Sequence, residues 1–330
     1  MASSDWQNFL TQQGYSVDDN DQLVSENMPQ KGQACVYDLS QLGSLVCAGE
    51  DAQNFLQGQL SNDISDLATV GDMQLSAYCT PKGRMLALFT VIKRDEESFF
   101  LFAPQAVITK VKSRLQMFVM RAKVTLSDNE DTVIFGYQEN TATSDDMGKL
   151  FDSQLTAAIP NTQNRYLVVL PTDKAIDICS SLPEPCTLVD HRHWQTLDIS
   201  DGIPQLNIEL VDELIPQSIN LDLVGGVNFK KGCYPGQEII ARIKYRGKPK
   251  TRMLSAEIAS HAAPAIGSPV FIDGRAQSAG VVISLGTKNS ETTAILITCP
   301  VSTLHEGNHY LGAPDGEKIE RTIQAYSITT

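Results

Sequence analysis

The most informative stretch of this 330-residue sequence reads Lys231-Gly232-Cys233-Tyr234-Pro235-Gly236-Gln237-Glu238. Two glycines bracket a tight turn that Pro235 stiffens. The apolar spacing from Gln237 to Tyr245 predicts a helix that begins where the turn ends. Cys233 therefore precedes a helix N-terminus and lies beside two lysines, and both features favour the thiolate. We expect Cys233 to be a reactive or ligand-binding thiol, and the alternative is a small apolar side chain packed in a turn.

Basic residues are concentrated around this stretch. The segment Lys230–Arg252 carries a net charge of +7, with Glu238 as its single acidic residue, whereas the rest of the chain carries −20. Six of the cations occupy even positions from Arg242 to Arg252, so an extended strand would place all six on one face. The first interpretation is a sheet edge protected by its charges. The second is a surface for a polyanionic small molecule or RNA, with Lys244, Arg246 and Lys248 at its centre.

The composition limits the class of protein. A net charge of −13 and the scarcity of aromatic residues from Lys244 to Arg252 count against a general nucleic-acid binder. No apolar run approaches the roughly 18 residues that span a bilayer, and residues 1–20 lack the pattern of a signal peptide. We therefore expect a cytoplasmic protein in which most of the seven cysteines are reduced.

Hydrophobic periodicity outlines the order of elements. Strands are predicted within 34–49 and at 74–79, 84–93, 98–102, 123–126, 132–137 and 165–170. Helices are predicted at 4–13, 50–60, 104–120, 144–158, 172–181 and 191–200. After Arg252, short β-rich segments recur between Gly, Pro and Asn turns, which is typical of a small barrel or sandwich. Because strands and helices do not strictly alternate, the pattern favours an α+β fold.

Several familiar motifs do not occur in the sequence. It has no Gly-x-Gly-x-x-Gly, no P-loop, no Gly-x-Ser-x-Gly and no Cys-x-x-Cys. Cys186, His191 and His193 provide at most three loosely spaced ligands, so we predict no metal site.

The Cys233 motif closely resembles the signature of the YgfZ family, folate-binding relatives of the glycine-cleavage T-protein, an aminomethyltransferase. The resemblance extends to Phe55-Leu56-Gln57-Gly58-Gln59-Leu60-Ser61-Asn62-Asp63 and to Pro216-Gln217-x-x-Asn220-Leu221. It implies two ferredoxin-like α+β domains, one inserted in the other, and a C-terminal β-barrel around a central channel. The implied domains are a folate-binding body (1–120 and 186–246), a second ferredoxin-like domain (121–185) and the barrel (247–330).

The resemblance also implies a function. The family binds tetrahydrofolate and supports iron–sulfur enzymes, including those that methylthiolate tRNA, and Cys233 matches its functional cysteine. Trp194 matches a tryptophan that lines the folate site, although such a residue could instead pack a domain interface. The remaining expected contacts for the pterin and its anionic tail are Asp201, Lys230, Lys231, Tyr234, Gln237 and Arg242.

The sequence departs from the family pattern at three places. Leu42 stands near the position of a second folate-site tryptophan, and Ser200 replaces a pterin-binding Glu, with Asp201 beside it. The catalytic Asp of the T-protein has no counterpart around residues 82–88. Aminomethyl transfer by the T-protein mechanism is therefore disfavoured. The primary hypothesis is a folate-dependent accessory protein for iron–sulfur enzymes that modify tRNA. The alternative is a folate-dependent one-carbon transferase or demethylase, so whether a reaction is catalysed stays open at this point.

Overall fold

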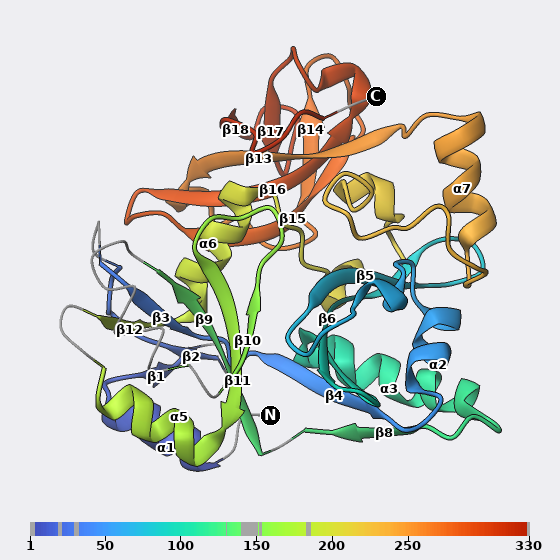
Figure 1. The fold of residues 1–330 in the computed structure, drawn as a ribbon. Helices are drawn as coiled ribbons and strands as arrows, with labels where there is room; N and C mark the ends of the chain where they lie inside the picture. Colours follow the sequence, from blue (N-terminus) through green and yellow to red (C-terminus); the bar gives the residue numbers. More distant parts are fainter. Residues whose placement is uncertain are drawn as a thin grey trace. The chain divides into compact units, whose positions relative to one another are not determined.

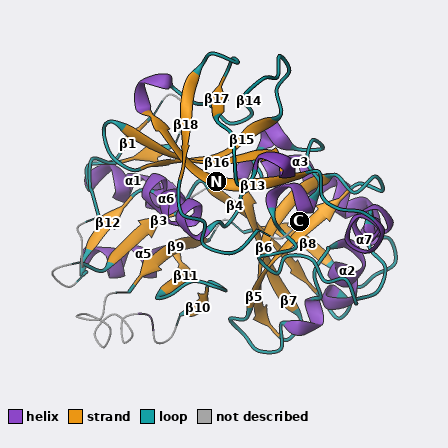
Figure 2. Ribbon diagram, turned by 90° about the horizontal axis from the view of Figure 1, so that it is seen from above, coloured by secondary structure: helices purple, strands orange, loops and turns teal. Residues whose placement is uncertain are grey.

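The computed structural model describes residues 4–18, 22–29, 33–129, 131–139, 151, 154–182 and 186–328. The chain divides into two compact units. The first comprises Met1–Gln53, Asp66–Gln74 and Thr90–Trp194, and the second comprises Asn54–Ser65, Leu75–Phe89 and Gln195–Thr330. Figure 1 labels the elements, and Figure 2 shows the mixture of strands and helices that makes this an α+β protein.

One five-stranded sheet belongs entirely to the first unit, with strand order β10-β11-β9-β3-β12. Its strands are β10 (Leu155–Ala158), β11 (Arg165–Pro171), β9 (Thr132–Gln138), β3 (Cys35–Asp38) and β12 (Thr187–Val189). Only β3 and β12 pair in parallel; the other neighbours are antiparallel. Helices α1 (Ser4–Gln12) and α5 (Thr172–Ser180) lie side by side against it (Figure 1). Alternate β9 residues, such as Val133 and Phe135, face these helices and form the core.

The second five-stranded sheet has the order β5-β6-β7-β4-β8. Its strands are β4 (Leu42–Ala48), β5 (Met73–Cys79), β6 (Met85–Asp95), β7 (Ser98–Pro104) and β8 (Thr125–Asp128). Helix α3 (Gln105–Val119) packs on β4 and β7 through its buried apolar face, and α2 (Ala52–Gln59) follows β4. Strand β6 is apolar and buried along most of its length, which is the pattern of a strand covered on both faces.

Six strands of the second unit close into a barrel, in the order β13-β16-β15-β14-β17-β18. They are β13 (Thr251–Ala259), β14 (Pro269–Ile272), β15 (Gly280–Thr287), β16 (Thr292–Pro300), β17 (His309–Leu311) and β18 (Glu317–Arg321). The inward-facing side chains are mostly β-branched or Leu, such as Ile295 and Ile297, and they fill the barrel. Figure 1 shows these strands in orange and red.

The remaining elements are a short hairpin, helices α6 and α7, and five 3₁₀ turns. Strands β1 (Ser16–Val17) and β2 (Leu23–Val24) form a small hairpin. Helix α6 (His191–Asp201) follows β12, and α7 (Gln237–Arg246) precedes β13. The 3₁₀ turns are η1 (Ile64–Asp66), η2 (Ile208–Leu210), η3 (Pro216–Ile219), η4 (Ser260–Ala262) and η5 (Val301–Thr303).

The α+β class and the C-terminal barrel predicted from the sequence are confirmed. The domain bounds and the central channel stay predictions. Two local predictions are wrong. The helix expected at 144–158 ends in strand: Leu155–Ala158 is β10, paired with β11 in the sheet, and most of 144–153 lies outside the described residues. The helix predicted from Gln237 to Tyr245 is confirmed as Gln237–Arg246, so the competing interpretation of an extended strand from Arg242 to Arg252 is wrong as far as Arg246.

Candidate functional site

Cys233 lies on a loop, here called the Cys loop (residues 231–237), that leads directly into α7. The side-chain amide of Gln237 donates to the carbonyl oxygens of Lys231 and Gly232, both at 3.3 Å. The main-chain N–H of Gln237 donates to the carbonyl of Tyr234 at 3.2 Å. The first residue of the helix therefore closes the loop on itself, and Cys233 is held at an exposed position between these contacts.

Lys231 fixes the beginning of the Cys loop. Its ammonium group donates to the main-chain carbonyls of Gln57, Leu60 and Asn62 at 2.8, 2.7 and 2.7 Å. The residue is only 8% exposed, and burial lowers its pKa to about 8, an effect that the charge of Asp63 opposes. Since an ammonium has three donors, all are used inside the protein. Lys231 therefore has a structural role here rather than the expected role of binding an anionic tail.

The side chains of Ser61 and Asn62 form hydrogen bonds with the segment that precedes the Cys loop. The Ser61 hydroxyl donates to the carbonyl of Gly226 at 2.7 Å, and the Asn62 amide donates to the carbonyl of Gly225 at 2.7 Å. The side-chain oxygen of Asn228 accepts the main-chain N–H groups of Lys230 and Lys231. These contacts connect the motif at residues 55–63 with the segment that leads into the Cys loop.

Close backbone contact fixes the end of the loop. Gly236 has a φ of +82°, which a residue with a side chain rarely adopts. A Cβ atom there would lie 2.5 Å from the carbonyl oxygen of Thr80 and 2.7 Å from the Cα of Gly83. The turn between β5 and β6 therefore packs directly against the loop. Tyr234 is buried, and the Lys231 ammonium lies 5.4 Å from its ring centroid.

The third motif, residues 216–221, contacts both α7 and β13. The Gln217 amide donates to the carbonyl of Ile240 in the middle of the helix at 2.8 Å. Asn220 accepts from the N–H of Met253 and donates to its carbonyl, so it pairs with β13 as a strand residue would. Arg252 forms a buried ion pair with Asp222 at 2.6 Å and donates to the Gln217 carbonyl at 3.0 Å. Arg252 is therefore part of the core and not of an exposed basic stripe.

Cys233 differs from the other cysteines in its exposure. Cys35, Cys47, Cys79, Cys179 and Cys299 are buried, Cys186 is half-buried, and Cys233 is exposed. Burial raises the pKa of Cys47, Cys79 and Cys299 to about 12, so these thiols stay protonated. The other cysteines therefore lie mostly in the interior, and Cys233 is the accessible thiol.

Four expected cations are exposed on and after α7. Arg242, Lys244 and Arg246 lie on the helix, and Lys248 follows it. Because the helix continues to Arg246, Arg242 and Arg246 share a face by the i, i+4 relationship, whereas Lys244 lies on another side. Lys230, just before the Cys loop, is exposed as well.

The two remaining expected residues lie on α6. Trp194 belongs to the first unit and is 5% exposed. The guanidinium of Arg165 lies 4.1 Å from its ring centroid, Tyr37 packs at 5.3 Å, and a Cβ on Gly136 would lie 2.4 Å from the indole. The ring is thus enclosed by its own unit, which favours the packing interpretation. Asp201, in the second unit, ends α6 and is half-buried.

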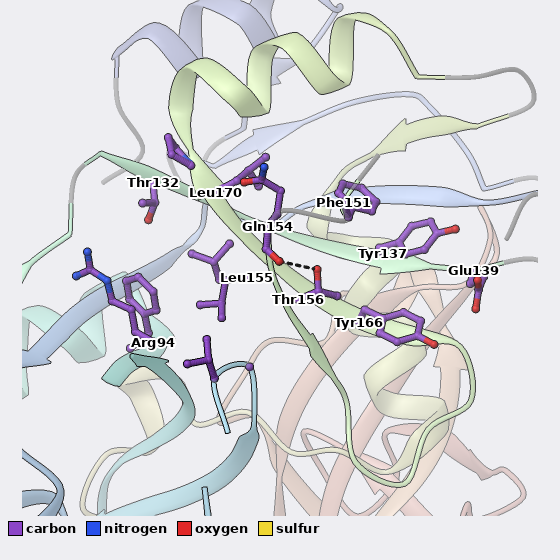
Figure 3. Close-up of a pocket in the computed structure, with 15 residues that line it drawn as sticks. Arg94, Thr132, Tyr137, Glu139, Phe151, Gln154, Leu155, Thr156, Tyr166 and Leu170 are labelled. Atoms are coloured by element: carbon purple, nitrogen blue, oxygen red, sulfur yellow. Dashed lines mark hydrogen bonds between the residues drawn. The ribbon is translucent and has the colours of Figure 1, made fainter. Parts of the chain in front are cut away.

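A cleft of about 910 Å³ lies in the first unit (Figure 3). Arg94, stacked on Phe100, stands at one end, and Tyr137, Tyr166 and Glu139 stand at the other, with β10 between them. Its lining, within the part of the chain that the structure describes, includes no site residue expected from the sequence.

The described residues include no group of three or more His, Cys, Asp and Glu side chains that could hold a metal ion. They also include no helix that is long and apolar enough to cross a membrane.

Sequence reasoning missed several residues that build the site. The clamp by Lys231 and the contacts of Ser61, Asn62 and Asn228 were not foreseen, because their partners are main-chain carbonyl and N–H groups that leave no trace in a sequence. Tyr245, 65% exposed on α7, was also missed, although its position among the cations could have revealed it.

Comparison with known proteins gives one consistent result. The family model described as the GCVT N-terminal domain matches residues 8–135. The "tRNA-modifying protein YgfZ" of Edwardsiella ictaluri (strain 93-146) is 32% identical over 233 residues, covering 65% of this chain and 70% of that protein. The protein of the same name from Aliivibrio fischeri (strain MJ11) is 29% identical over 241 residues, covering 71% and 74%.

Among solved structures, the glycine cleavage system aminomethyltransferase T from Bartonella henselae is similar with a TM-score of 0.75 and 14% sequence identity, and it covers 97% of this chain and 96% of that one. This similarity shows a shared fold. The family assignment rests on the sequence identity to the Edwardsiella ictaluri protein, of which this chain covers 70%. The chain belongs to the YgfZ family.

Proposed function

We propose that this protein supports tRNA modification as a folate-binding protein, with Cys233 as its working thiol. The observation that carries the proposal is the exposed thiol on a loop fixed at both ends, by the Lys231 clamp and by Gly236. The relatives are named tRNA-modifying proteins, which supports the role in tRNA modification, and the aminomethyltransferase T fold supports a folate ligand.

The exposed position of Cys233 favours a reactive thiol over a side chain that packs in the interior. An exposed cysteine contributes little buried area, whereas the loop around it is built from specific contacts that hold it in one place. A thiolate is both a nucleophile and a soft metal ligand. Since iron–sulfur clusters usually take four thiolates, a single exposed Cys233 suits a step that assists an iron–sulfur enzyme better than permanent storage of a cluster.

The residues expected to hold a folate fit that ligand in part. Lys231 is fully engaged by carbonyls, and Trp194 is enclosed by its own unit. Lys230 and Arg242 are exposed and could meet an anionic glutamate tail. We therefore propose folate binding from family and fold, with these two cations as contacts, and derive no chemical step through the folate.

The thiol proposal is tested by complementation. A strain that lacks its own family member and shows reduced tRNA methylthiolation receives the wild-type chain, Cys233→Ser or Cys186→Ser. The last variant is the matched control, because Cys186 is the half-buried cysteine and lies in the other unit. We expect methylthiolation to be restored by the wild type and by Cys186→Ser but not by Cys233→Ser. Full restoration by a well-folded Cys233→Ser protein would refute the role of the thiol.

Folate binding is tested separately by calorimetry with mono- and polyglutamyl tetrahydrofolate. We expect both to bind and the polyglutamyl form to bind more tightly, with Lys230→Ala and Arg242→Ala removing that advantage. Absence of heat with either ligand at millimolar concentration would exclude folate binding and leave the thiol proposal standing.

A further inference from the structure

The exposed side of α7 combines cations with aromatic rings. We define the α7 surface as Arg242, Lys244, Tyr245, Arg246 and Lys248, together with Phe229. The i, i+3 and i+4 relationships place Arg242, Tyr245 and Arg246 on one face of the helix. Tyr245 lies next to Phe229, whose ring is half-buried.

The aromatic pair presents a ring to solvent. The ring centroids of Phe229 and Tyr245 are 6.1 Å apart at an interplanar angle of 77°. In this edge-to-face arrangement the Phe229 ring supports Tyr245, which is 65% exposed. The ammonium of Lys244 lies over the Phe229 ring, 5.4 Å from its centroid, so the ring that supports Tyr245 also holds a cation. The scarcity of aromatic residues in the sequence of this segment is thus compensated by Phe229, which the fold brings from outside it.

The charge of this surface opposes that of the rest of the chain. The segment Lys230–Arg252 carries +7 within a chain of −13. Two of the segment's cations do not contribute to the surface, because Arg252 pairs with Asp222 in the core and Lys231 is buried on carbonyl groups. The α7 surface itself keeps four exposed cations, and Glu238 is the single acidic residue of the segment. Such a local positive surface on an acidic protein attracts polyanions selectively.

We propose that the α7 surface binds single-stranded RNA, with phosphates on Arg242, Arg246 and Lys248 and a base stacked on Tyr245. Cations spaced along a helix and its following turn match a chain of repeated phosphates, and an exposed aromatic ring stacks on any base. The choice of RNA among polyanions rests on the proposed role in tRNA modification. Helix α7 is about 15 Å long, so an RNA bound along it lies close to the Cys loop from which the helix begins.

The test measures binding of an unmodified tRNA transcript and of a short single-stranded RNA to the full chain by fluorescence anisotropy. Three phosphate contacts predict a log–log salt slope of about −2, which weakens binding roughly 20-fold between about 50 and about 200 mM salt. Arg242→Ala/Arg246→Ala/Lys248→Ala should remove most of this slope. Tyr245→Ala should weaken binding about tenfold, and Tyr245→Phe should restore it.

The matched control removes three exposed cations of the first unit, Lys110→Ala/Arg121→Ala/Lys174→Ala, with the same change in net charge. Equal loss of binding in the control and the α7 variant would overturn the proposal, because it would show a non-specific charge effect. Binding of polyglutamate peptide as tight as that of RNA would also overturn it, in favour of an acidic protein partner.

The outcomes separate this inference from the proposed function. If RNA does not bind while methylthiolation still depends on Cys233, the α7 inference fails and the proposed function stands. If RNA binds through α7 while Cys233→Ser complements fully, the inference stands and the role of the thiol fails.

Discussion

Replacement of Lys231 by methionine tests whether the Cys loop is held by the buried ammonium. The substitution keeps an apolar stem of similar length and leaves the carbonyls of Gln57, Leu60 and Asn62 without their donor. Hydrogen bonds to a charged group contribute about 1.5–3 kcal/mol each, which gives roughly 4–9 kcal/mol for three. Relief of the burial cost offsets part of this loss.

That offset follows from the pKa of Lys231. Burial lowers the pKa from 10.5 to about 8, and each unit corresponds to about 1.4 kcal/mol, so removal of the charge returns roughly 3 kcal/mol. We therefore expect Lys231→Met to lower the free energy of unfolding by about 1–6 kcal/mol, measured by urea denaturation. Lys230→Met is the control, because the neighbouring side chain is exposed, and we expect a change below about 0.5 kcal/mol.

A second measurement distinguishes a loop clamp from a general loss of stability. The alkylation rate of Cys233 under native conditions should rise in Lys231→Met, since the loop opens locally before the protein unfolds. If Lys231→Met unfolds within about 0.5 kcal/mol of the wild type and Cys233 reacts at the wild-type rate, the clamp does not hold the loop and the reasoning is refuted.

Three further predictions concern the interior. Arg252→Met should cost about 3–5 kcal/mol, because it leaves Asp222 as a buried unpaired carboxylate; denaturation that equals the wild type at neutral pH would contradict this. Gly136→Ala should destabilise the first unit by about 1–3 kcal/mol, since its Cβ would meet Trp194 at 2.4 Å, with a matching change in tryptophan fluorescence. Burial raises the pKa of Asp38 to about 6, so the folded state binds its proton more tightly than the unfolded state, and stability should fall as pH rises from about 4 to about 6. Asp38→Asn should remove that decline, and identical pH profiles of the two proteins would exclude it.

Patterns within single elements made much of the fold predictable. The amphipathic period of residues 105–119 and the apolar runs of 85–92 and 98–102 identified α3, β6 and β7. The C-terminal barrel followed from short β-rich segments between turn residues. The order of strands within each sheet, such as β10-β11-β9-β3-β12, was not predictable, because pairings between distant segments depend on tertiary packing.

The basic segment shows why one pattern can mislead. Cations at every second position suggested a strand, yet Ile239, Ile240 and Ile243 provide apolar contacts at helical spacing, and Ile240 is fully buried. Burial of these side chains stabilises the helix, whereas the exposed cations have no strong preference for either conformation. The apolar residues therefore decided the local structure, and Gly247 and Pro249 placed the end of the helix.

The sequence identified the thiol of the candidate site but not the contacts that hold it. Cys233 was identified from its residue type and setting, and its exposure agrees with a functional thiol. The role of Lys231 was not identified, because a lysine beside a cysteine suggests an electrostatic partner, whereas three carbonyls of a segment about 170 positions away receive its ammonium. Carbonyl groups belong to every residue, so no sequence pattern marks them. The fold brings the three motifs together around the Cys loop: residues 57–62 supply acceptors for Lys231, Gln217 donates to α7, and the thiol between these contacts is exposed. A substitution in any of the three should therefore act through the position of Cys233.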